Sequence, residues 1–322
     1  MIKIIQVVES GPSDAQAAGI SARLDPAKFE AALVDAATGE GELRKLFAER
    51  RPDVVHSYSS IAALRAAKSA GVKNIFYSPR GYASLSPDLS FVSRSINRLA
   101  ERSAARIGTT IASSPSEAEQ ARALGAANVV QVRDAYLGEF LEPKPHEGLV
   151  VASSGPMTSA TNPDSWVLLA QRLCDSRNGL GCLWIGGGED EAAARVNLTN
   201  MNLLSKVEVT GAVPADAARE RLRGIDLFVH YTRAGASSAP ILDAMAYNLP
   251  VVASDLPAHR DMVENGVTGY LVKDEVELLE RCQALLDDDD LRRRMGAAAR
   301  GMVIREFSRE RQLSELSRLY SA

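Results

Sequence analysis

The sequence predicts an α/β protein made of two domains with parallel sheets. Short apolar runs alternate with helical patterns along the whole chain, and a proline-containing segment interrupts that alternation near its middle. The length of 322 residues also exceeds the usual size of one domain. Alternation of this kind predicts βα units, parallel strands and right-handed crossovers.

The predicted strands follow one another at regular intervals. They fall at residues 2–8, 29–34, 53–57, 74–77, 109–113 and 129–132 in the first half, and at 149–153, 181–185, 207–209, 227–231, 251–254 and 269–272 in the second. Continuous apolar stretches such as Val251-Val252-Ala253 are typical of strands that are covered on both faces. Between the strands, segments such as 41–50, 92–106 and 163–174 have a helical period.

The segment 142–148 predicts the boundary between the domains, because it contains two prolines, a glycine and charged residues. We therefore expect one domain over 1–143 and another over 148–305. The acidic run 287–290 lies between helical patterns, which favours a helix end and the cap of the next helix over a metal site. A last amphipathic helix is expected over 309–320, with leucines at helical spacing.

Composition and charge narrow the class of protein. The chain is 46% hydrophobic and 24% charged, and its net charge of −4 argues against a broadly basic nucleic-acid-binding surface. Cys174, Cys182 and Cys282 have neither disulfide nor zinc spacing, and we expect them to be buried in a reducing compartment.

The hydropathy pattern predicts a cytoplasmic protein. The apolar run 4–8 is too short for a signal peptide, and no run reaches the roughly 18 residues that span a bilayer. Peripheral contact with the inner face of a membrane stays open.

Candidate ligand loops are those that follow the strands, because open parallel sheets bind ligands at the carboxyl ends of their strands. Gly186-Gly187-Gly188 directly follows a predicted strand, but it lacks both the dinucleotide fingerprint and the lysine of a P-loop. It is either a structural turn or a loop that lies close to a ligand.

The loop at 232–240 is a second candidate. Ser237 and Ser238 precede an apolar helix, and Arg233 lies at the end of the preceding strand. Backbone N–H groups and one guanidinium could hold a diphosphate there. The alternative is a capped structural helix.

The stretch 239–255, APILDAMAYNLPVVASD, followed by His259-Arg260-Asp261 and by ENGVTGYLV at 264–272, resembles the donor-site signature of retaining glycosyltransferases of family four. The segments YSPRGY at 77–82 and ASSPSE at 112–117 resemble landmarks of that family's first domain. The resemblance implies the GT-B fold, with an acceptor domain, a nucleotide-sugar donor domain, an active site in the cleft between them, and a last helix (306–322) that packs back on the first domain.

This resemblance also assigns donor-side roles. Asp243 would contact the ribose and Gly186–Gly188, Ser237 and Ser238 would bind the donor. Family members carry two glutamates eight positions apart, of which the first falls on Gly235 here and the second on Asp243. They also carry an arginine and a lysine where this chain has Pro156 and Thr161. A histidine that contacts the donor sugar is replaced by Arg80. Arg80 and Arg233 are therefore the candidate catalytic cations, because departing diphosphate charge must be stabilised.

On the acceptor side we expect Gly11, Ser57, Tyr58 and Tyr82, with the tyrosines stacking on a sugar ring. The alternative is that both tyrosines are half-buried packing residues.

The resemblance implies sugar transfer, with retention, from a nucleoside-diphosphate donor to a lipid-linked or oligosaccharide acceptor in bacterial surface-polysaccharide assembly. No cofactor, no metal and no nucleic-acid partner are expected. Two alternatives remain: a degenerate GT-B protein that binds a sugar nucleotide or a partner enzyme without transfer, which the missing cations favour, and a nucleotide-sugar epimerase. The sequence lacks the Asp-x-Asp at a strand end of a metal-dependent GT-A transferase and the Gly-x-Ser-x-Gly of a triad hydrolase.

Overall fold

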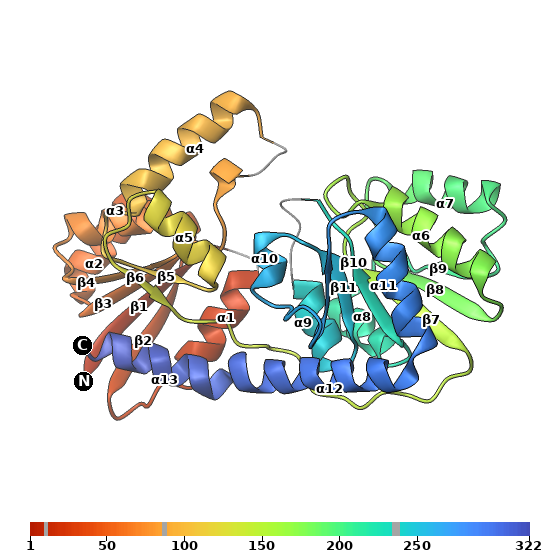
Figure 1. Ribbon diagram of the computed structural model, residues 1–322. Coiled ribbons are helices and arrows are strands. Elements are labelled where there is room, and N and C mark those ends of the chain that lie inside the picture. The colour runs from red at the N-terminus through yellow and green to blue at the C-terminus, as the bar shows by residue number, and fades with distance from the viewer. Residues whose placement is uncertain (10–11, 86–88, 234–238) are drawn as a thin grey trace. The chain divides into compact units, whose positions relative to one another are not determined.

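The computed structural model describes residues 1–9, 12–85, 89–233 and 239–322. They form two compact units, the first made of Met1–Leu137 with Glu306–Ala322 and the second of Gly138–Arg305 (Figure 1). Each unit contains a six-stranded sheet in which all pairings are parallel. The predicted fold class, α/β with two parallel sheets, is confirmed.

The first unit has the strand order β2-β1-β3-β4-β5-β6. Its strands are β1 (Ile2–Val8), β2 (Phe29–Asp35), β3 (Val54–Tyr58), β4 (Asn74–Ser78), β5 (Thr109–Ala112) and β6 (Val129–Gln131). Its helices are α1 (Pro12–Ser21), α2 (Glu40–Arg50), α3 (Ile61–Ser69), α4 (Phe91–Ala104), α5 (Pro115–Ala123) and α13 (Arg309–Tyr320), with short 3₁₀ turns η1 (Ala36–Thr38) and η2 (Ala83–Leu85).

Hydrophobic cores lie on both faces of this sheet. One core joins strand residues such as Ile4 and Val54 to α1 and to Leu316 and Tyr320 of α13. The other joins Val7 and Val55 to side chains of α2 and α3. The last helix of the chain is therefore part of the core of the first unit.

The second unit has the strand order β12-β11-β10-β7-β8-β9. Its strands are β7 (Leu149–Ser154), β8 (Leu180–Ile185), β9 (Val207–Val209), β10 (Leu227–His230), β11 (Val251–Ser254) and β12 (Gly269–Val272). Its helices are α6 (Pro163–Ser176), α7 (Glu191–Asn200), α8 (Ala215–Leu222), α9 (Ala239–Ala246), α10 (Pro257–Arg260), α11 (Glu275–Asp287) and α12 (Asp289–Glu306), the last of which ends at the border of the first unit.

The core of the second unit lies under α6 and α11, which contact each other over one face of the sheet (Figure 1). Trp166 and Trp184 meet edge to face in it, with ring centroids 5.4 Å apart. Cys174, Cys182 and Cys282 are free thiols buried in the same core, as the sequence predicted.

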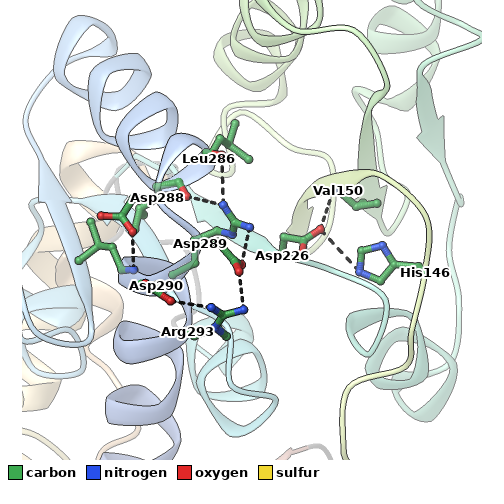
Figure 2. Close-up of polar contacts among 11 residues, drawn as sticks. His146, Val150, Asp226, Leu286, Asp288, Asp289, Asp290 and Arg293 are labelled. Carbon is green, nitrogen blue, oxygen red and sulfur yellow. Dashed lines mark hydrogen bonds and ion pairs between the residues drawn. The ribbon is translucent and has the colours of Figure 1, made fainter.

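Polar contacts fix the two charged segments that the sequence singled out (Figure 2). In the linker, His146 lies 3.6 Å from Asp226, whose carboxylate also accepts the backbone N–H of Val150 at 2.8 Å. In the acidic run, Asp288 separates α11 from α12 and accepts the backbone N–H of Leu291 at 2.8 Å. The prediction of a helix end and a cap is confirmed.

Candidate functional site: the carboxyl end of the second sheet

The direction of winding reverses between β7 and β10 of the second sheet, since β8 and β9 lie on one side of β7 and β10 to β12 on the other. Ligands of open α/β sheets bind at such a switch point, outside the carboxyl ends of the strands. The segments that follow these two strands, 155–162 and 231–233, are therefore the first place to look for a site.

These two segments contact each other. The backbone N–H of Arg233 donates to the carbonyl of Ala160 at 2.7 Å, and its guanidinium donates to the carbonyl of Ser159 at 3.3 Å. The Arg233 residue is otherwise exposed. Among the residues that the structure describes, this carbonyl is the one partner of the guanidinium, which keeps most of its hydrogen-bonding capacity for an anion.

Thr161 occupies the position where the family resemblance predicts a lysine, and its side chain forms hydrogen bonds within the loop. Its hydroxyl donates to the carbonyl of Pro156 and accepts the backbone N–H of Thr158 at 3.0 Å. The side chain is buried, with 6% of the residue exposed. The position therefore stabilises the turn and supplies no charge.

The glycine-rich turn after β8 packs against the turn after β7. A Cβ on Gly186 would lie 2.2 Å from the carbonyl oxygen of Gly155, and one on Gly188 would lie 2.3 Å from that of Met157. The backbone φ of Gly186 is +138°. These glycines are required by the close approach of two backbones, and their predicted contact with a donor stays a prediction.

The segment after β10 leads to α9, on which Asp243 lies one turn from the start. The Asp243 carboxylate accepts the Nε–H of Arg219 at 3.0 Å, and both side chains are about one quarter exposed. Ser237 and Ser238, predicted to cap this helix, lie outside the described residues.

A surface pocket of 440 Å³ lies at the carboxyl ends of β10, β11 and β12. Its lining includes the hydroxyl-bearing residue Thr232, whose buried Oγ1 has no hydrogen-bond partner in the described part of the chain. The pocket also contains Asp255, whose ion pair with Arg260 lowers the pKa of its carboxyl group.

Two further charged residues of this pocket, Lys273 and Glu275, were missed by the sequence reasoning. Glu275 accepts the Ser165 hydroxyl at 2.6 Å. The signal was present in the sequence, because Lys273 directly follows the predicted strand at 269–272 and Glu275 lies two positions further on, but the candidate loops did not include this one.

In the first unit, the predicted residues at the carboxyl ends of β3 and β4 are buried among polar partners. His56 contacts the Tyr320 hydroxyl at 2.6 Å through Nδ1 and the Ser78 hydroxyl at 2.9 Å through Nε2. Burial, aided by the positive charge of Arg80, lowers the pKa of His56 to about 3. Tyr58, predicted to stack on an acceptor sugar, is 1% exposed and stacks on His56 instead, with ring centroids 4.1 Å apart.

The guanidinium of Arg80 forms an ion pair with Asp134 of the same unit and lies 5.3 Å from the centre of the Tyr58 ring. Its backbone φ is +58°, and the neighbouring Gly81 N–H donates to Glu117 at 2.8 Å. Burial lowers the pKa of Arg80. Arg80 is thus tied into the first unit, and a role for it at a donor phosphate stays a prediction.

The remaining acceptor-side predictions fall on buried or undescribed positions. The Ser57 hydroxyl is buried and donates to the carbonyl of Ser60 at 2.7 Å. Tyr82 is 8% exposed and packs with Ala121 and Leu124. Gly11 lies outside the described residues. Packing accounts for the contacts of both tyrosines within the first unit, and their stacking on a sugar ring stays a prediction.

No cluster of three or more His, Cys, Asp or Glu side chains arranged to hold a metal ion occurs in the part of the chain that the structure describes. Within the same residues, every helix is too short or too polar to cross a bilayer.

Comparison with known proteins places this architecture in the GT-B class of glycosyltransferase folds. The HepE protein of Anabaena, solved in complex with UDP, superposes with a TM-score of 0.82 at 15% identity, covering 99% of this chain and 100% of that one. Residues 139–302 match the model of glycosyl transferases group 1, and residues 9–133 match that of the glycosyl transferase 4-like domain. The chain belongs to the glycosyl transferases group 1 family.

Curated relatives match over shorter stretches. The N-acetyl-alpha-D-glucosaminyl L-malate synthase of Bacillus anthracis is 26% identical over 43% of this chain and 36% of its own length. The phosphatidyl-myo-inositol mannosyltransferase of Mycobacterium leprae is 30% identical over 43% of this chain and 37% of its own length. The matched region thus spans little more than a third of each relative.

Proposed function

We propose that this protein transfers a sugar, with retention of configuration, from a nucleoside-diphosphate donor to a lipid-linked or saccharide acceptor in cell-surface polysaccharide synthesis. The reaction uses no metal and takes place in the cytoplasm at the inner face of the membrane. Family membership supports the reaction class. The names of the relatives, one of which is a mannosyltransferase of phosphatidyl-myo-inositol, support a lipid or small hydroxyl acceptor.

One observation carries the donor half of this proposal: the loops after β7 and β10 meet at the switch point of the second sheet, and Arg233 is exposed there. The donor diphosphate lies at this point, near the start of α9. The positive end of the α9 dipole and the Arg233 guanidinium supply positive charge to the phosphates.

Asp243 then accepts hydrogen bonds from the ribose. Its link to Arg219 through one carboxylate oxygen holds the side chain in place and leaves acceptor capacity on the carboxylate. In this arrangement Asp243 takes the part that a longer glutamate has in the family, and Arg219 orients it.

Catalysis depends on stabilising the departing diphosphate. Pro156 and Thr161 provide no cation, and each lost preorganised donor costs about 3 kcal/mol at the transition state. Arg233 replaces part of that stabilisation, because its guanidinium can bridge two phosphate oxygens. Arg80 is the less suitable cation of the two, since it is already paired with Asp134.

The second candidate function, a GT-B protein that binds without transfer, has one specific observation in its favour. The Thr161 hydroxyl is committed to the loop at the position where the family has a lysine. The family match does not favour this candidate, because it describes transferases.

A two-stage assay separates the candidates. UDP, GDP and their sugars are first screened by thermal shift, since a ligand that binds only the folded state raises the melting temperature. Our proposal predicts a shift with one nucleoside diphosphate, release of that nucleotide when a lipid-linked or saccharide acceptor is added, and a product with the donor's anomeric configuration. A shift without turnover establishes the binder, and no shift with any nucleotide overturns the donor site.

A further inference from the structure

Helix α4 (Phe91–Ala104) presents an apolar surface to solvent. Phe91, Val92, Ile96 and Leu99 are 78%, 66%, 62% and 68% exposed. Val92, Ile96 and Leu99 have the spacing i, i+4, i+7, so they form one stripe along the helix, with Phe91 at its start. Large apolar side chains that gather on one exposed face indicate an interaction site.

A second stripe runs along the same exposed side of α4. Arg94, Arg98 and Arg102 have the spacing i, i+4, i+8, and Arg106 follows just after the helix; all four residues are exposed. None of their guanidinium groups has a carboxylate partner within the described residues.

Three helices of the second unit differ from α4 in the pairing of their arginines. Arg195 of α7, Arg281 of α11 and Arg293 of α12 each lie in an ion pair with an acid of their own helix. On α4 the acid is Glu101, which is buried and accepts the backbone N–H of Ser84 at 3.0 Å. The exposed surface of α4 is therefore positively charged and apolar, although the whole chain has a net charge of −4.

We propose that α4 docks the protein on an anionic lipid surface. The apolar stripe enters the boundary between headgroups and acyl chains, and the arginines extend to the lipid phosphates at that level. Acidic headgroups attract each nearby cation and so add to the apolar contribution. The arginines also argue against a second copy of this chain as the partner, because a symmetric α4–α4 contact would bring two rows of positive charge together.

This inference is independent of the donor site, because every residue that carries it belongs to the first unit. It goes beyond the proposed sugar transfer by naming the surface and the lipid chemistry through which the protein reaches a membrane. Its failure would leave the nucleotide assay unaffected.

Flotation of the full chain with lipid vesicles tests the proposal. We expect binding to phosphatidylcholine vesicles that contain phosphatidylglycerol, weaker binding to pure phosphatidylcholine, and weaker binding at high salt. The triple variant Arg94→Gln/Arg98→Gln/Arg102→Gln is expected to lose about a hundredfold in partitioning onto the anionic vesicles. Ile96→Ser/Leu99→Ser is expected to lose at least about tenfold.

The matched control is Arg44→Gln/Lys45→Gln/Arg50→Gln on α2. It removes the same charge from exposed positions of the same unit, on a helix without a large exposed apolar side chain. It should bind anionic vesicles nearly as the parent does. Equal loss in this control would overturn the assignment to α4 and indicate attraction by overall charge. Thermal melts and nucleotide binding verify that each variant folds.

A fluorescence readout covers the case in which several substitutions together unfold the protein. Phe91→Trp places an indole on the exposed face, whereas the two native tryptophans are buried. Its emission should shift to the blue on anionic vesicles and stay unchanged with soluble phosphate. No blue shift together with no flotation refutes lipid docking. Refutation also follows if the parent is a dimer that Ile96→Ser/Leu99→Ser converts to a monomer, since α4 is then a contact between copies.

Discussion

The polar residues at the carboxyl ends of the two sheets differ in burial and in pairing. In the first unit, His56 and Ser78 are buried and bonded to each other, and Arg80 is paired with Asp134. In the second unit, Arg233 is exposed and a 440 Å³ pocket with the charged residues Asp255 and Lys273 lies nearby. We call the carboxyl end of the first sheet the closed edge, because its polar side chains contact one another. We call the carboxyl end of the second sheet the open edge, because its polar side chains face a pocket or solvent.

The difference comes from α13. This helix brings Tyr320 to His56, and it brings Gln312 to Asp134, where the amide donates at 3.1 Å. Because His56 and Asp134 are bonded to these partners, loss of either contact should affect folding. The polar groups of the second edge have free capacity, and their loss should affect ligand binding. Each prediction below separates these two kinds of effect.

The largest effect is expected from acid at the closed edge. The folded pKa of His56, about 3, lies below its ordinary value of 6.5, so the unfolded chain binds a proton over a pH range in which the folded chain does not. The contribution of neutral His56 to the free energy of unfolding is therefore fully present above pH 6.5, and it is lost as the pH falls towards 3. The loss is on the order of 4 kcal/mol in the free energy of unfolding.

Urea unfolding between pH 7 and 4 measures this loss. His56→Gln should be less stable at neutral pH and should lose less stability on acidification than the parent does. The free energy of unfolding of the variant should still fall somewhat with pH, because burial lowers the pKa of His259 as well. Parallel pH profiles for parent and variant would show that the His56 network does not govern acid stability.

A somewhat smaller loss is expected from Gly186→Ala at the open edge. The new Cβ would lie 2.2 Å from the carbonyl oxygen of Gly155, at a backbone φ that non-glycine residues rarely adopt. The free energy of unfolding should fall by about 3 kcal/mol. Gly301→Ala on α12, where the added methyl meets only the end of the Arg305 side chain at 3.4 Å, should be neutral or slightly stabilising.

Urea titration of both alanine variants provides the comparison. If Gly186→Ala is as stable as Gly301→Ala, the two turns have more room than the structure gives them, and the glycines are better explained by a ligand.

Arg233→Ala should change binding and leave stability nearly unchanged. Loss of one charged hydrogen-bond donor weakens nucleoside-diphosphate binding by about 1.5–3 kcal/mol, or roughly ten- to a hundredfold in Kd. Arg80→Ala is the matched substitution at the closed edge and should lower the melting temperature with little change in Kd. Calorimetry with UDP and GDP on the two variants and the parent measures both. The reverse pattern would assign the phosphate cation to Arg80.

The smallest effect is expected from Asp243→Asn. The amide oxygen can still accept from a ribose hydroxyl, so the loss is about 1 kcal/mol, or fivefold in Kd. The salt dependence of binding should stay unchanged, because Asp243 does not contact the phosphates in our proposal. Calorimetry at two ionic strengths checks this, and a Kd equal to that of the parent would remove Asp243 from the site.

The strands of both units were predictable from the sequence, because continuous apolar runs are sufficient to indicate buried parallel strands. The run predicted as 109–113 is β5 (Thr109–Ala112), and the run predicted as 227–231 is β10 (Leu227–His230). Differences of one residue arise at strand ends, where side chains already turn towards the loops.

The closed edge could not be predicted, since its contacts join residues far apart in the chain. His56 and Tyr320 are separated by 264 positions, and no local pattern links them. The exposure of Ile96 was equally hidden, because helical spacing indicates a stripe without showing whether a neighbour covers it. For Gly186 the sequence left open a structural turn and a loop close to a ligand, and the structure shows a close approach to the backbone of Gly155.

Hydrogen exchange of the parent protein with and without saturating nucleoside diphosphate tests most directly that the second sheet carries the open, nucleotide-binding edge. The account predicts slower exchange in the amides of 155–162, 186–190 and 231–233 when the nucleotide is bound. The amides of 56–60 and 78–82, already held by contacts within the first unit, should change little. Protection confined to 56–60 and 78–82, or nucleotide binding without protection at 155–162 and 231–233, would contradict it.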